Sequence, residues 1–99
     1  MAHEHCVVNR DLAKIKLATF DFLKENAVVF TANYFLKEVR ANQVRSRRVM
    51  ARTITECLTM AANEACRRNS GPRLEAIEKF AQTIGDRLFL DIDVPTGIL

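Results

Sequence analysis

The sequence predicts a mostly α, four-helix single domain that ends in a short C-terminal β-strand. Three observations lead to this fold class. The 99 residues include only three glycines and two prolines, which disfavours turn-rich β architectures. Apolar residues make up 48% of the chain and recur mainly at helical spacing, whereas residues 88–94 alternate between apolar and other side chains up to the second proline. A chain of this length forms one domain, so we expect residues 1–99 to share a single core.

The first predicted helix runs from Asp11, a suitable N-cap, to Asn26. Residues 1–10 show no period and are expected to be flexible, or briefly extended over 6–8. The apolar face of the helix comprises Leu12, Ile15, Phe20, Phe22 and Leu23.

A second, shorter helix is expected over 32–40 after a connector at 27–30, with Thr31 as its cap. Its apolar side comprises Phe35, Leu36 and Val39. We interpret 41–43 as a turn; the alternative is one continuous helix over about 31–69.

The long helix expected over about 44–69 has the clearest pattern in the chain. It contains neither glycine nor proline. One stripe at helical spacing comprises Met50, Ile54, Cys57, Leu58, Ala61 and Ala65. We therefore expect Ile54 and Leu58 to be buried, and we expect their neighbours from the other helices to be Phe22, Leu36 and Phe80.

A fourth helix is expected from Pro72 to about Ile84, with Gly85 as its terminator. Its buried face comprises Leu74, Ile77, Phe80, Ala81 and Ile84. The alternation over 88–94 then predicts a strand. Because a lone strand leaves its backbone groups unpaired, this strand favours a homodimer through pairing with a second copy.

The charge of the chain is concentrated in one segment. The formal net charge is +3, but residues 37–52 carry six basic side chains and one acidic side chain. No acidic residue occurs between Glu38 and Glu56. The charged residues of this window are Arg40, Arg45, Arg47, Arg48 and Arg52. Arginine pairs well with phosphate because its planar guanidinium offers several donors.

These arginines predict a nucleic-acid-binding face. Arg45, Arg48 and Arg52 are spaced by three and four residues and therefore project from one side of the helix. Thr55 continues this line as a candidate base or phosphate contact, and Thr59 extends it. The competing interpretation is a solvated face with ion pairs. Within the segment only Arg52 has an acidic partner at helical spacing, Glu56. Carboxylates elsewhere in the fold, for example Asp91 and Asp93, would have to supply the remaining negative charge.

The order of a short helix, a turn and a basic helix resembles a helix-turn-helix in outline, and the short-long-short order also resembles a histone-like handshake. Neither outline assigns the chain to a family. We expect a small nucleic-acid-binding regulatory protein, with duplex DNA as the expected ligand and a role in transcription regulation. The alternative is a helical protein-interaction module, an adaptor or inhibitor, that docks its basic face on an acidic protein surface.

No pattern in the sequence predicts an enzyme, a cofactor or a metal site. His3, His5 and Cys6 are potential zinc ligands, but the sequence offers no second ligand pair, because Cys57 and Cys66 are nine residues apart on the long helix. Asp91 and Asp93 would share one side of the strand without a third ligand. There is no glycine-rich phosphate loop and no nucleophile elbow.

The N-terminal residues show neither the basic region nor the apolar core of a signal peptide, and no apolar run approaches the length of a membrane span. The cysteine count is odd. Both observations favour a cytoplasmic protein without a membrane partner.

Overall fold

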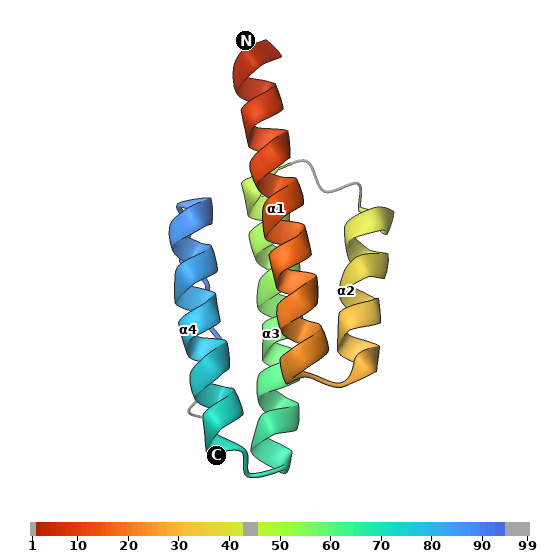
Figure 1. The fold of residues 1–99 in the computed structure, drawn as a ribbon, viewed down its shortest axis with the longest axis vertical. Coiled ribbons are helices and arrows are strands. Elements are labelled where there is room, and N and C mark those ends of the chain that lie inside the picture. The colour runs from red at the N-terminus through yellow and green to blue at the C-terminus, as the bar shows by residue number, and fades with distance from the viewer. Residues whose placement is uncertain (1, 43–45, 95–99) are drawn as a thin grey trace.

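The computed structural model describes residues 2–42 and 46–94, with side chains from Asp11 onward. Four helices make up most of this range: α1 (Ala2–Asn26), α2 (Val29–Ala41), α3 (Arg47–Arg67) and α4 (Gly71–Leu88). They lie side by side in one elongated bundle of 47 × 23 × 17 Å (Figure 1). The prediction of four helices in one domain is therefore confirmed.

Helix α3 is the centre of the bundle. It packs against α1, α2 and α4, while α1 also contacts α2 and α4. Figure 1 shows α2 and α4 on opposite sides of α3. Three neighbours bury most of the circumference of α3, so only one strip of this helix faces solvent.

The core follows the predicted stripe of α3. All six residues of that stripe are buried, and Ile54 and Leu58 are fully buried. From α1 and α4, Phe22 and Phe80 stack with ring centroids 4.1 Å apart and join the two helices beside the core. Leu36 is only half-buried, and α2 instead contributes Phe35 and Val39 to the core. The other buried apolar residues are Leu12, Ile15, Leu23, Ala32, Ala51, Ala62, Ile77, Ala81, Ile84 and Leu88.

The N-terminal prediction was wrong, because the first helix begins at Ala2 and not at Asp11. Asp11 lies inside α1 and does not cap it. No glycine or proline interrupts the chain before Gly71, so nothing in residues 2–10 stops a helix once the packed turns from Leu12 onward have formed. In Figure 1 this first part of α1 extends beyond the ends of the other helices.

The second helix also begins earlier than predicted. Val28 is its N-cap and makes no side-chain capping bond, whereas Thr31 lies inside the helix and is buried. Val29 and Phe30, which were expected in the connector, form the exposed first turn.

Helices α2 and α3 are separate, which excludes the single continuous helix. Of the predicted turn over 41–43, Asn42 forms the C-cap of α2, and residue 43 lies outside the described residues. Helix α2 ends at Ala41, and α3 begins at Arg47 behind an N-cap, Ser46. The two helices run side by side in opposite directions (Figure 1). A helix-turn-helix needs its second helix steeply inclined to the first and free to enter a groove. The packing of α3 along the bundle therefore differs from that outline.

Helix α3 passes into α4 through a short turn at 68–70. Asn69 takes the left-handed conformation, with φ 53°. Ser70 caps α4 by accepting a hydrogen bond from the Arg73 amide at 3.4 Å. Pro72 lies in the first turn of α4, as predicted.

Gly85 does not terminate α4. It is buried inside the helix, which continues to Leu88 and ends at Phe89 in a left-handed conformation. A Cβ atom added to Gly85 would lie 2.7 Å from the backbone oxygen of Leu90. The glycine therefore allows the chain to fold back closely against its own helix, a tertiary requirement that local sequence does not reveal.

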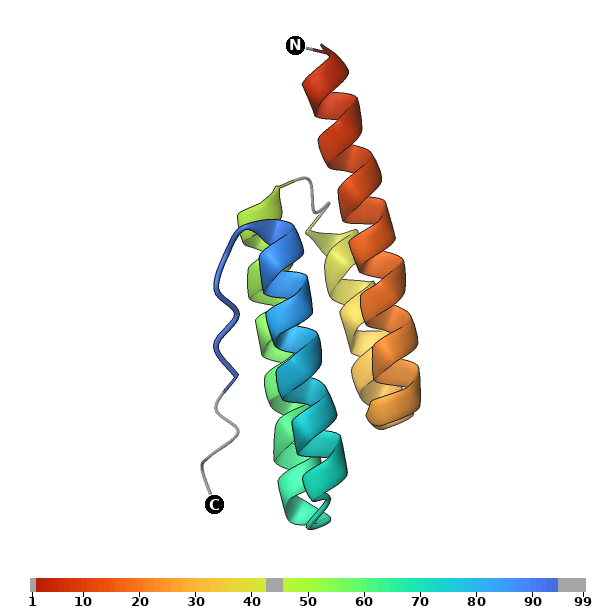
Figure 2. The ribbon, with the colours of Figure 1, turned by 60° about the vertical axis from the view of Figure 1, so that its left-hand side comes forward.

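The predicted strand over 88–94 is absent from the described residues. Leu88 belongs to α4, and Leu90–Val94, which we call the C-terminal strap, turns back alongside α4 without strand structure (Figure 2). Leu90, Ile92 and Val94 are half-buried against the core, while Asp91 and Asp93 are exposed. The alternation is thus real, but it reflects one-sided packing on a helix. The homodimer, which was argued from an unpaired strand, loses that basis.

Replacing Gly85 by alanine tests the packing of the strap. Alanine favours a helix by about 1 kcal/mol over glycine, but its Cβ would collide with the Leu90 backbone oxygen. Overpacking costs about 1–3 kcal/mol, and the helix preference of alanine offsets about 1 kcal/mol of this cost. We therefore expect Gly85→Ala to lower the free energy of unfolding, measured in urea, by up to about 2 kcal/mol. Gly71→Ala is the matched control, because nothing lies within 4 Å of its added Cβ. A Gly85→Ala protein that is about 1 kcal/mol more stable than wild type, as helix preference alone would make it, would contradict the close approach of the strap.

No described helix combines the length and the apolar composition that crossing a membrane requires.

Candidate nucleic-acid interface

The first turn of α3 presents two consecutive arginines at a helix N-terminus. The Ser46 hydroxyl accepts a hydrogen bond from the Val49 amide at 3.2 Å, and the Ser46 carbonyl accepts one from the Met50 amide at 3.1 Å. This cap makes Arg47 and Arg48 the first helical residues, and the first turn contains no acidic side chain. Because the N-terminal end of a helix carries partial positive charge, cations are unfavourable there by about 0.3–1 kcal/mol each.

Four of the five predicted arginines lie at one end of the bundle, and we call this set the arginine end: Arg40, Arg47, Arg48 and Arg52. Arg40 is in the last turn of α2, and α2 ends where α3 begins, at the upper end in Figure 1. Arg40, Arg48 and Arg52 are exposed, whereas Arg47 is half-buried. Arg45 lies outside the described residues.

Arg47 contacts an aromatic ring. Its guanidinium carbon lies 5.3 Å from the centroid of the Phe89 ring, which follows the last residue of α4. This cation–π contact joins the start of α3 to the end of α4. Arg87, in the last turn of α4, is exposed at the same end.

The described carboxylates do not neutralise the arginine end. Glu56, the expected partner of Arg52, instead accepts a very short hydrogen bond from the Tyr34 hydroxyl of α2. This bond raises the pKa of Tyr34 to about 12, with smaller contributions from desolvation and from nearby negative charge. Among the described residues no ion pair joins Asp91 or Asp93 to any arginine. The ion-paired interpretation therefore lacks its two proposed sources of negative charge.

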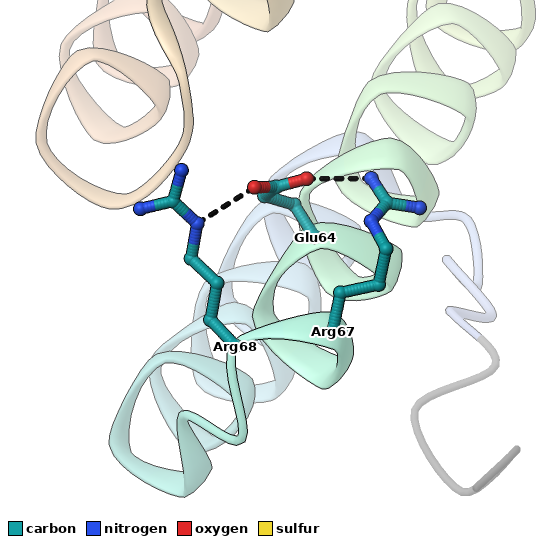
Figure 3. A network of polar contacts seen from close by, with 3 residues as sticks. All are labelled: Glu64, Arg67 and Arg68. Atoms are coloured by element: carbon teal, nitrogen blue, oxygen red, sulfur yellow. Dashed lines mark hydrogen bonds and ion pairs between the residues drawn. The ribbon is translucent and has the colours of Figure 1, made fainter.

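The opposite end of α3 is arranged differently (Figure 3). Glu64 accepts bonds from Arg67 at 2.5 Å and from Arg68 at 2.7 Å, and these bonds lower the pKa of Glu64. Arg67 also lies in the last turn, where the helix dipole favours a cation. The two arginines at the C-terminal end of α3 thus share one carboxylate, whereas Arg47 and Arg48 at its N-terminal end have no described carboxylate partner.

Thr55, the predicted base or phosphate contact, is less able than the arginines to donate a hydrogen bond to a ligand. The half-buried Thr55 donates its hydroxyl hydrogen to the Ala51 carbonyl at 2.7 Å, and Thr59 donates to the Thr55 carbonyl at 2.8 Å. A threonine can give only one hydrogen, so Thr55 would have to break this bond before donating to a phosphate. It remains able to accept a hydrogen bond.

The other candidate chemistry does not assemble into a site. The backbone at His3, His5 and Cys6 is helical, but their side chains lie outside those described. Burial raises the pKa of the Cys57 thiol to about 12, so this sulfur is protonated at neutral pH and inaccessible. Among the described residues no group of three histidine, cysteine or acidic side chains could hold a metal ion.

Sequence reasoning missed Phe89. It treated this residue only as a member of the alternating segment, whereas the ring is 77% exposed beside the arginine end. The pattern of the sequence could not have revealed this, because the position of the ring depends on where α4 ends.

The chain matches no protein-family model, no curated protein and no solved structure.

Proposed function

We propose that this protein is a small regulatory protein that binds nucleic acid through the arginine end. The observation that carries the proposal is the position of Arg48. It is exposed in the first turn of α3, and within the described part of the chain no carboxylate pairs with it. Helix dipole and neighbouring arginines both oppose a cation there, so the arrangement weakens folding and favours an external anion.

The surrounding arginines extend this site. Arg52 lies one turn further along the same face, and Arg40 approaches from the end of α2. Arg40 also benefits from its place in a last turn, so its presence alone would not indicate a ligand. Several arginines at one end nevertheless suit a chain of phosphates, which each guanidinium can contact with paired donors.

The alternative partner is an acidic protein surface, whose carboxylates would pair with the same arginines. A competition experiment distinguishes nucleic acid from an acidic protein as the ligand. A fluorescently labelled 16-nucleotide DNA should bind at low salt, as measured by anisotropy, and unlabelled DNA should displace it at much lower concentration than polyglutamate of equal charge. Equal displacement by both polymers would contradict nucleic-acid recognition, and so would the absence of binding at low salt.

A further inference from the structure

Phe89 occupies a conformation that disfavours its side chain. It has φ 57° and ψ 35° directly after α4, and its amide donates to the Asp86 carbonyl at 3.3 Å. The next amide, of Leu90, donates to the Gly85 carbonyl at 3.1 Å, which completes a helix-ending motif that usually has glycine at this place. A bulky residue is strained in this backbone region.

Packing does not compensate for this strain. The ring is 77% exposed, the largest exposed fraction among the large apolar side chains of the described residues. The Arg47 guanidinium makes a cation–π contact with this ring, 5.3 Å from its centroid. A strained and exposed aromatic residue at a charged surface is the kind of feature that clusters at binding sites.

We propose that Phe89 is a stacking platform for an unpaired nucleobase, so that the arginine end binds single-stranded nucleic acid. This inference rests on the proposed function and specifies its ligand. Proteins that bind single strands combine aromatic rings, on which bases stack, with cationic groups that track the phosphates. Phe89 supplies the ring, Arg47 contacts the same ring, and Arg48 and Arg52 supply the cations.

The duplex is the less suitable ligand for this surface. In a duplex the faces of the bases are covered by their neighbours, so an exposed ring has no base to stack on away from the ends. Groove recognition would need a protruding helix, whereas α3 is enclosed by α1, α2 and α4. This replaces the duplex DNA expected from the sequence.

The charges around Phe89 also orient the bound nucleic-acid strand. The ring also borders a cleft of about 720 Å³ between α4 and the strap, whose lining includes Asp86, Asp91 and Asp93. These carboxylates repel phosphate, while the arginines of α3 attract it. The backbone of the bound strand therefore passes over the start of α3 and not through the cleft.

Phe89→Gly tests the platform without weakening the fold. Glycine accepts the left-handed backbone, so the melting temperature should stay the same or rise. Its affinity for a 16-nucleotide oligo(dT), measured by anisotropy, should fall at least about fivefold, the lower bound for the loss of one stacked base. Phe30→Ala is the control, because Phe30 is 66% exposed in the first turn of α2, at the opposite end of the bundle.

Phe89→Trp gives a direct measure of stacking. The chain contains no tryptophan, so the new indole would be the single strong fluorophore. Oligo(dT) should quench its emission, and the Phe30→Trp protein should show no such change. Quenching at position 89 alone, together with a preference for oligo(dT) over a blunt duplex, is the expected result.

The outcomes separate the two proposals. Salt-sensitive binding by wild type that is unchanged in Phe89→Gly, or that favours the duplex, would overturn the stacking platform and leave the proposed function intact. If wild type binds no oligonucleotide at low salt, both are overturned.

Discussion

Replacing Leu58 by alanine is expected to lower the free energy of unfolding by about 2–5 kcal/mol. Leu58 is fully buried in α3, the helix that contacts all three others. The substitution leaves a cavity where several helices meet, and the surrounding side chains can fill it only in part. The free energy of unfolding of a native domain is about 5–15 kcal/mol, so this loss would remove a large fraction of the stability.

Urea unfolding followed by far-ultraviolet circular dichroism measures this loss. Leu17→Ala removes the same atoms from α1 at a position that is 62% exposed, and it should change the stability by no more than about 0.5 kcal/mol. A loss below about 1 kcal/mol for Leu58→Ala would mean that α3 is not the central helix.

The centre of this fold could be predicted because burial there depends on spacing alone. The stripe from Met50 to Ala65 repeats at helical spacing over four turns, and every member is buried. The start of α4 was also predictable, since Pro72 has a local preference for the first turn of a helix and lies there in the structure.

The ends of the other helices could not be predicted from local preferences. Asp11 and Thr31 are good capping residues that lie inside helices, because the residues before them contain no glycine or proline that would stop a helix from extending in the N-terminal direction. Gly85 is a good terminator that lies inside α4, because the strap approaches it too closely for a side chain. At Gly85, therefore, a tertiary contact overrides the local preference.

The strand predicted from the C-terminal alternation was wrong, although the alternation itself has a structural cause. Leu90, Ile92 and Val94 are half-buried against the core. A period of two shows only that one side of an extended segment is covered, and a helix can cover it as well as a strand. The argument for a dimer lost its basis at this step, and the dimer itself stays an untested prediction.

The arginines of the candidate site could be predicted from the sequence, but Phe89 could not. The lack of acidic residues between Glu38 and Glu56 identified the arginines, and Arg40, Arg48 and Arg52 are indeed exposed. The position of Phe89 depends on the end of α4, which lies four residues after its predicted end. The contact of Phe89 with Arg47 depends on how α3 and α4 pack together.

Replacing Arg48 and Arg52 together by glutamine is expected to weaken nucleic-acid binding and to make it less sensitive to salt. Each phosphate that a cation neutralises contributes about 0.7 to the log–log salt slope for a single strand. If both arginines contact phosphate, the slope should therefore flatten by about 1.4 units. Folding should not suffer, because both side chains are exposed and Arg48 opposes the helix dipole.

The chain offers a control of equal charge on the same helix. Arg67→Gln with Arg68→Gln also removes two positive charges, but these arginines are engaged by Glu64 at the far end of α3. Anisotropy titrations of oligo(dT) between 50 and 200 mM salt, about the range over which such binding changes most, give the slope for each protein. A flatter slope in the Arg48 and Arg52 variant alone locates the phosphates at the start of α3. Equal flattening in both variants would mean that the net charge of the protein governs binding, and the arginine end would then be no binding site.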